Sequence, residues 1–384
     1  MRLPTALMKA TGFLAAGLLS APWAAGAASQ AKPPAAKAPA AFFSGFGKDS
    51  LLTLLDALRS RSRVFQPSVL YLGAYGVDPD LSAALHEEGA NWRYAPMLTA
   101  VNRKDPVRPE RVLTPQDLEK LPESAAAYAG PLPHDLSLSE ATQQIEHALA
   151  KLDPDVQMHW GLEIGRRLRD QIRKAQRKGA VVDSWQFDEI ISSAFSSSAS
   201  GAVWRRFLAG ELHGLTFGRP ELGDKPLTGL ICIPHPERFA AMRGDYADRL
   251  IEEVYRSGRL ILGEEYPVFD GDPVRSAKQM HQAAEAALRA RGGIAAKLAG
   301  RYAALMTPGY NVLNPEGQAT GYNGNVHKWS DSKVDLWRTR YAQERARAGL
   351  AGFGQYHFVG GDARPAVVRG AVDAVAAALY PKKQ

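Results

Sequence analysis

Short apolar, β-branched runs alternate along the chain with longer segments in which apolar residues recur every three or four positions. The short runs predict strands, and the longer segments predict amphipathic helices. Strands are expected at 68–75, 92–101, 181–187, 228–233, 260–266, 302–306 and 354–359. Helices are expected at 51–62, 80–88, 139–152, 164–180, 202–212, 246–257, 273–298, 332–348 and 365–379.

This repeated order of strand and helix predicts an α/β protein with a parallel sheet. An open doubly wound sheet, which is the alternative, carries a G-x-G-x-x-G turn after its first strand, and Gly73-Ala74-Tyr75-Gly76 does not match it. We therefore expect one (β/α)8 TIM-like barrel domain over 42–384. Seven strands are visible, so an eighth is expected near 157–162 or within 51–65.

The N-terminus has the three parts of a secretory signal peptide. Arg2 and Lys9 form a positive region, an apolar run follows at 12–19, and Ala25-Gly26-Ala27 predicts cleavage. An uncleaved anchor is the alternative. The Pro- and Ala-rich residues 28–41 predict a disordered linker. We expect a secreted or periplasmic protein without stable membrane insertion, because no later apolar run is long enough to span a bilayer.

Composition narrows the classes of function. A chain of 384 residues that is 45% hydrophobic and 23% charged can bury a sizeable core. Its net charge of +7 is modest for this length, so nucleic acid is not an expected partner. Cys232 is the single cysteine, and no H-E-x-x-H is present, so neither an intramolecular disulfide, nor a metal site, nor a cofactor is expected.

One helix, 164–180, concentrates positive charge. Arg166, Arg169, Arg173 and Arg177 follow one another at helical spacing, opposite an apolar face. This pattern is typical of an outer helix with one solvated face. Binding of anionic polymer or lipid headgroups is the alternative role.

Carboxylates accumulate where the strand at 181–187 ends. The sequence Asp183-Ser184-Trp185-Gln186-Phe187-Asp188-Glu189 places acids on both sides of a tryptophan. Strand side chains alternate, so Asp183, Trp185 and Glu189 are expected on one side and Asp188 on the other. In a barrel, the carboxyl ends of the strands form the active face. The alternative is a helix N-cap at Asp188 or Glu189, with Trp185 in the core.

A second acidic strand end reads Leu262-Gly263-Glu264-Glu265-Tyr266. Adjacent acids on a strand point to opposite sides, so at most one of Glu264 and Glu265 is expected to be catalytic. Two carboxyl groups on different strands are what glycoside hydrolysis requires, one to protonate the leaving oxygen and one to act as nucleophile or base.

Aromatic, amide and imidazole side chains near other strand ends suit a polyhydroxylated ligand, because rings stack on sugar C–H faces while hydroxyls need donors and acceptors. The expected substrate-binding residues are Asp183, Trp185, Tyr75, His235, Tyr266, Tyr310, Asn311, Tyr322, Trp329 and His357.

The two acidic segments resemble the secreted barrel glycoside hydrolases, in which acids stand at carboxyl strand ends beside a tryptophan. The resemblance implies cleavage of glycosidic bonds in a polysaccharide, with Asp188 or Glu189 as general acid and Glu264 or Glu265 as the second carboxylate. The Asn-Glu pair of many retaining enzymes and the D-x-x-D-x-D-x-E pattern of chitinase-like families are absent, so no single family is indicated. The alternatives are a non-catalytic carbohydrate-binding protein, and a hydrolase with a metal held by His235, His357 and the acids.

Overall fold

The computed structural model describes about half of the chain. These residues are 40–45, 48–61, 69–74, 78–88, 92–98, 146–147, 149–187, 192–233, 236–262, 273–299, 302–306, 355–359, 369, 372–373 and 376. The chain divides into Met1–Lys37 and Ala38–Gln384, and all described residues belong to the second unit. The predicted signal peptide lies outside them.

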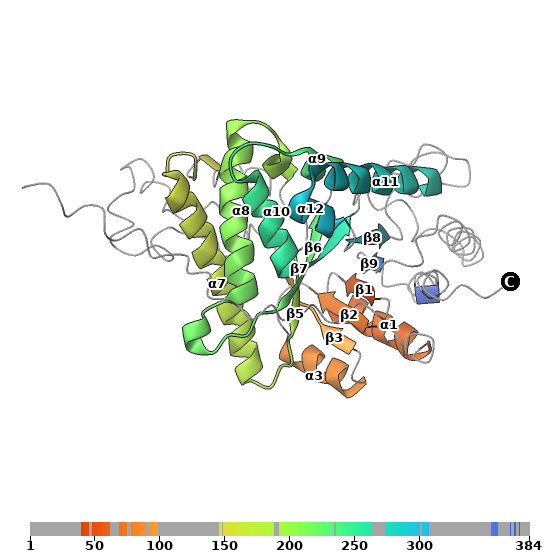
Figure 1. Ribbon diagram of the computed structural model, residues 1–384. Coiled ribbons are helices and arrows are strands. Elements are labelled where there is room, and N and C mark those ends of the chain that lie inside the picture. Colours follow the sequence, from red (N-terminus) through yellow and green to blue (C-terminus); the bar gives the residue numbers. More distant parts are fainter. Residues whose placement is uncertain are drawn as a thin grey trace, which may run out of the picture. The chain divides into compact units, whose positions relative to one another are not determined.

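A single parallel sheet organises the described residues (Figure 1). Every strand except β1 overlaps a run predicted from the sequence. The strands are β1 (Ala40–Gly45), β2 (Val69–Ala74), β3 (Trp92–Tyr94), β4 (Met97–Leu98), β5 (Ser184–Phe187), β6 (Thr228–Ile233), β7 (Gly258–Leu262), β8 (Tyr302–Met306) and β9 (Gln355–Val359).

The strand order is β3-β2-β1-β9-β8-β7-β6-β5-β4, and each neighbouring pair is parallel. Its two ends, β3 and β4, are consecutive in the chain and separated only by Ala95 and Pro96. The Ala95 amide donates to the Leu72 carbonyl of β2, and the Gln186 amide of β5 donates to the Pro96 carbonyl. Residues 92–98 therefore pair with β2 through β3 and with β5 through β4.

The prediction of a regular eight-stranded (β/α)8 barrel is wrong. The sheet has nine strands rather than eight, because Ala95 and Pro96 divide one extended segment into two, and α-helices hold more of the described residues than strands do. The strand that the sequence did not reveal is β1, which begins inside the predicted linker 28–41. Both positions suggested for an eighth strand are instead helical, since 157–162 belongs to α7 and 51–59 to α1.

Most of the helices overlap predicted amphipathic segments, but α7 begins ten residues before the predicted 164–180 and α9 was not predicted. The predicted helix 332–348 and most of 139–152 and 365–379 lie outside the described residues. Figure 1 shows α7, α8 and α10 side by side, and contacts join α7 to α8 and α8 to α10. No helix in the described ranges combines the length and apolar composition needed to cross a membrane. The α-helices are α1 (Lys48–Arg59), α3 (Pro79–Glu88), α7 (Pro154–Arg177), α8 (Ala199–Phe217), α9 (Pro236–Ala241), α10 (Ala247–Ser257), α11 (Pro273–Arg291) and α12 (Gly293–Leu298).

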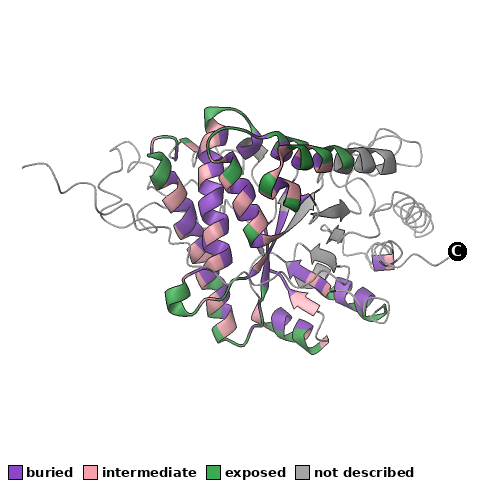
Figure 2. Cartoon of the chain, in the orientation of Figure 1, coloured by how far each residue is buried: buried purple, intermediate pink, exposed green. Residues whose placement is uncertain are grey.

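The contact between α7 and α8 is close because glycines face backbone on both helices. Gly161 and Gly165 of α7 lie against the α8 backbone near Phe207 and Glu211, and Gly210 of α8 lies against the α7 backbone. A glycine has no Cβ, so two backbones can approach closely there. Figure 2 shows buried residues where these helices meet.

Replacing Gly165 by alanine is expected to destabilise the protein. The added Cβ would lie 2.1 Å from the Glu211 carbonyl oxygen and 2.6 Å from the Leu215 amide nitrogen, so α8 as a whole has to shift. Overpacking of this kind costs about 1–3 kcal/mol, even though alanine is the better helix former. Urea unfolding of Gly165→Ala measures the loss, with Gln171→Ala at an exposed α7 position as control. Unchanged stability of Gly165→Ala would contradict the close contact.

The basic face of α7 is not the solvated face that the sequence predicts. Arg169 is only 2% exposed, and Arg173 forms an ion pair with Asp224, whose carboxyl is also buried. Burial lowers the pKa of Arg169 to about 10, against the attraction of Asp224. Arg166 pairs with Glu163 on the same helix. Arg169 and Arg173 therefore connect α7 to the turn after α8, whereas Arg177 is exposed.

Candidate functional site

The acids predicted as catalytic follow two strands that flank β6. Asp188-Glu189 follows β5 directly, and Glu264-Glu265 follows β7 after one glycine. Because β5, β6 and β7 are parallel, both sequences leave the sheet at its carboxyl edge, where sites of parallel α/β proteins are found. The four acids themselves lie outside the described residues.

The register of these strands sets the starting distance between the two acidic sequences. Phe187 of β5 pairs with Ile231 of β6, and Ile231 pairs with Leu260 of β7. Neighbouring strands are about 4.8 Å apart, so the β5 and β7 backbones are about 10 Å apart. Paired-carboxylate hydrolysis requires carboxyl groups about 5–9.5 Å apart. Side chains from strands with one neighbour between them can reach such separations.

The structure describes only some of the predicted substrate-binding residues. Only Asp183 and Trp185 have described side chains. His357 belongs to β9, of which the backbone is described. The residues outside the described ranges are Tyr75, His235, Tyr266, Tyr310, Asn311, Tyr322 and Trp329.

Trp185 is a core residue and not a platform for a sugar. Its side chain is fully buried, and its ring packs edge-to-face on Phe187 with centroids 6.1 Å apart. The ring also covers Gly229 of β6, where a Cβ would lie 2.4 Å from it. All four residues of β5 are buried. The side chains of β5 therefore pack in the core, and Trp185 is not exposed as a substrate-binding residue would be.

Asp183 lies at the opposite end of β5 from Asp188 and Glu189. It precedes the first strand residue, and its carboxylate forms an ion pair of 2.8 Å with Nε of Arg93 on β3. Burial of one side of the carboxyl raises the pKa of Asp183, although Arg93 and the Ser184 hydroxyl act in the other direction. The length of β5 therefore separates Asp183 from Asp188 and Glu189 along the chain.

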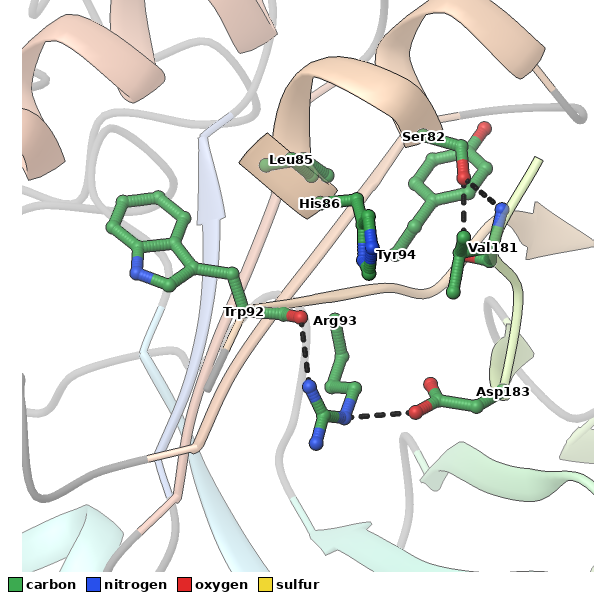
Figure 3. Close-up of a pocket in the computed structure, with 8 residues that line it drawn as sticks. All are labelled: Ser82, Leu85, His86, Trp92, Arg93, Tyr94, Val181 and Asp183. Carbon is green, nitrogen blue, oxygen red and sulfur yellow. Dashed lines mark hydrogen bonds and ion pairs between the residues drawn. The ribbon is translucent and has the colours of Figure 1, made fainter. Parts of the chain in front are cut away.

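The Arg93–Asp183 pair forms part of a described cavity of about 280 Å³ (Figure 3). The cavity lies at the amino ends of β3 and β5, beside α3. In Figure 3 the His86 ring and the ion pair border the same space. The lining residues are Ser82, Leu85, His86, Trp92, Arg93, Tyr94, Val181 and Asp183.

Two buried hydrogen-bonded residues hold this cavity in shape. The Ser82 hydroxyl accepts from the Val181 amide at 2.8 Å and donates to the Val181 carbonyl at 3.0 Å, so it ties α3 to the segment before β5. The Tyr94 hydroxyl accepts from the Asp78 amide at 2.8 Å just before α3. Burial raises the pKa of Tyr94 to about 12. The cavity therefore has a firm wall and an exposed charged pair.

The sequence did not indicate this cavity. Arg93 and Asp183 are ninety positions apart, and they meet only because 92–98 pairs with the region of β5. The sequence shows Arg93 as a polar residue within a strand and Asp183 as one of several acids. No local spacing connects them.

At the carboxyl edge, a buried arginine holds the loop that leads from β5 into α8. The guanidinium of Arg205 on α8 is 2% exposed and donates to the Ala194 carbonyl at 2.8 Å and the Ser196 carbonyl at 2.6 Å. It also donates to the Asp245 carbonyl before α10 at 3.0 Å. Burial lowers the pKa of Arg205. The described segments after β5 and after β6 are therefore joined through Arg205.

Within the described part of the chain, no three His, Cys, Asp or Glu side chains come together as a metal site would require. The functional groups that the described residues bring to the cavity are a carboxylate, an imidazole and a guanidinium group. No family model matches the sequence, and no curated protein matches it either.

Proposed function

We propose that the protein is an exported glycoside hydrolase-like enzyme that cleaves glycosidic bonds in a polysaccharide with two carboxyl groups. One comes from Asp188 or Glu189 after β5 and the other from Glu264 or Glu265 after β7. The observation that carries the proposal is the parallel order β5-β6-β7, from which both acidic sequences leave at the same edge. Export is inferred from the signal-peptide pattern of 1–27.

The chemistry follows from the two roles that carboxyl groups play in this reaction. The protonated carboxyl transfers its proton to the glycosidic oxygen as the bond to the anomeric carbon breaks. The second carboxylate either attacks that carbon or takes a proton from the water that attacks it. Water supplies the hydroxyl of the new reducing end, so no oxidant, metal or cofactor is needed. Asp183 and Trp185 have no part in this step, because they lie in the Arg93 cavity and the core.

Substitution of the four acids tests the proposal. Asp188→Asn, Glu189→Gln, Glu264→Gln and Glu265→Gln are compared on a panel of soluble and cell-wall polysaccharides by the release of reducing ends. We expect one variant of each pair to lose about 10²–10⁴-fold in turnover, which is the usual contribution of general acid–base catalysis. Glu221→Gln, at an exposed position after α8, is the matched control and should keep full turnover.

Two results would contradict the proposal. One is full turnover in all four variants, and the other is the absence of new reducing ends from every polysaccharide. Glycan binding without cleavage would instead identify a carbohydrate-binding protein.

A further inference from the structure

The cavity at the amino ends of β3 and β5 is a separate place from the proposed hydrolytic site. All strands are parallel, so this edge of the sheet is opposite the edge from which Asp188-Glu189 and Glu264-Glu265 leave. Figure 3 shows that the lining side chains come from α3, β3 and the residues before β5. What this cavity binds can therefore be argued from its own residues.

Among the described lining residues, the positive charge of Arg93 is opposed by the negative charge of Asp183. Arg93 and Asp183 form one ion pair, and their side chains are 35% and 51% exposed, so both reach solvent. A carboxylate ligand would face Asp183, and an ammonium ligand would face Arg93. The pair is therefore best complemented by a neutral ligand.

The polar side chains of the cavity are best matched by a ligand that can both donate and accept hydrogen bonds. The Asp183 carboxylate accepts hydrogen bonds, and the imidazole of His86, without a hydrogen-bond partner among the described residues, can do either. A hydroxyl group is donor and acceptor at once, so a ligand with several hydroxyls can bind both side chains.

The size and the apolar part of the cavity restrict the ligand further. The half-buried Trp92 and the 47% exposed Val181 supply apolar surface for C–H groups, whereas Leu85 is buried. The volume of about 280 Å³ is at the small end of ligand pockets, which are about 300–1,000 Å³. One six-membered sugar ring combines hydroxyls, a C–H face and a size of this order.

We infer that the cavity bordered by His86, Val181 and the Arg93–Asp183 pair binds a single neutral sugar ring, as a second glycan site on the face opposite the proposed hydrolytic one. The inference rests on the cavity's own residues and does not require that hydrolysis occurs. If both proposals are right, one polysaccharide chain can be held at a place where it is not cut.

Ligand-observed NMR on the full chain at pH 8 tests this inference. The probes are methyl glucoside, methyl xyloside and methyl N-acetylglucosaminide, with methyl glucuronide as the anionic counterpart of the first. At least one neutral probe should bind, and the glucuronide should bind more weakly than the glucoside. Val181→Trp fills the cavity mouth and should abolish binding, whereas Leu222→Trp, at a 58% exposed position elsewhere, should not.

A second variant removes the charge without adding bulk. Asp183→Asn loses a charge-assisted hydrogen bond, so affinity should fall about tenfold or more. The circular dichroism spectra of the variants report whether the fold is kept.

The inference is overturned if no neutral probe binds, or if Val181→Trp and Asp183→Asn bind as the parent does. Binding that is lost in Glu189→Gln or Glu264→Gln but kept in the two cavity variants would place the sugar at the carboxyl edge alone. That result would overturn this inference and leave the proposed hydrolysis standing. Loss of binding in the cavity variants, together with full turnover in all four acid variants, would support this site and reject the roles proposed for the four acids.

Discussion

Replacing Glu211 by glutamine is expected to stabilise the protein at alkaline pH and to leave its stability at pH 4 nearly unchanged. Glu211 lies on α8, is fully buried, and neither carboxyl oxygen has a hydrogen-bond partner among the described residues. Burial raises the pKa of Glu211 from 4.5 to about 8. A glutamine side chain has nearly the same shape and carries no ionisable proton. The substitution therefore removes the charge and leaves the packing of the side chain nearly unchanged.

The pH range of this effect follows from the direction of the shift. Below about pH 4.5 the carboxyl is protonated in both the folded and the unfolded chain, and it contributes no pH dependence. As the pH rises from there to about 8, the unfolded chain loses the proton while the folded chain keeps it. Folding then becomes less favourable by about 1.4 kcal/mol per pH unit, or ~5 kcal/mol over the whole interval. Above about pH 8 the penalty is constant.

Urea unfolding of the parent and of Glu211→Gln at pH 4, 6 and 9 measures the difference. The free energies of unfolding should agree at pH 4 and diverge by ~5 kcal/mol at pH 9, because only the parent carries the penalty. The exposed Glu221→Gln is the control, for which no such divergence is expected. A difference that is the same at pH 4 and pH 9 would show that Glu211 does not titrate in this way.

Replacing Asp224 by asparagine is expected to cost about 3–5 kcal/mol of stability, as the removal of one partner from a buried ion pair does. The Asp224 side chain is 4% exposed and accepts from Arg173 Nε at 2.8 Å and from the Arg219 amide at 2.6 Å. Arg169, which is 2% exposed, would lose its nearby negative charge, with Nε only 3.9 Å from the carboxylate. An asparagine can accept hydrogen bonds, but it cannot balance that charge.

The same pair makes stability depend on acid pH. Burial alone would raise the pKa of Asp224, but the hydrogen bonds from Arg173 and the Arg219 amide, with the charge of Arg169, outweigh burial and lower it. The stabilisation is therefore present above the ordinary pKa of an aspartate and is lost as the pH falls through the lowered value. Asp224→Asn should lack this part of the acid unfolding profile.

Urea unfolding at pH 7 checks the cost, and an exposed ion pair provides the comparison. Glu285→Gln removes the partner of Arg289, whose side chain is 60% exposed, and should cost at most about 1 kcal/mol. Equal losses in Asp224→Asn and Glu285→Gln would mean that the buried network contributes no more than a surface pair.

Hydrophobic periodicity was sufficient to find most of the elements. The apolar runs at 69–74, 228–233, 302–306 and 355–359 are strands, and the helical periodicity predicted at 164–180 and 202–212 lies within or overlaps the longer helices α7 and α8. Such patterns are local, because a strand or helix must bury one face whatever its neighbours are. The strand β1 escaped detection since Ala40 and Ala41 continue the composition of the preceding Ala-rich segment.

For the candidate site, the sequence predicted where carboxylates follow strands but not which side chains are exposed. Trp185 has the same sequence neighbourhood in the core as it would have beside a ligand. Its burial depends on Phe187 in its own strand and on Gly229 in the neighbouring one. Asp183 was likewise grouped with Asp188 by proximity in sequence, although the length of β5 separates them.

By itself, the sequence determined the alternation of strands and helices, the parallel sheet and the positions of the acidic strand ends, because each depends on periodicity and order within short stretches. Tertiary structure alone decided the nine-stranded order that 92–98 joins, the meeting of Arg93 with Asp183, and the burial of Glu211 beside the glycines of α7. These features join residues far apart in the chain. They depend on how completely the packed elements exclude water, which no local pattern of residues records.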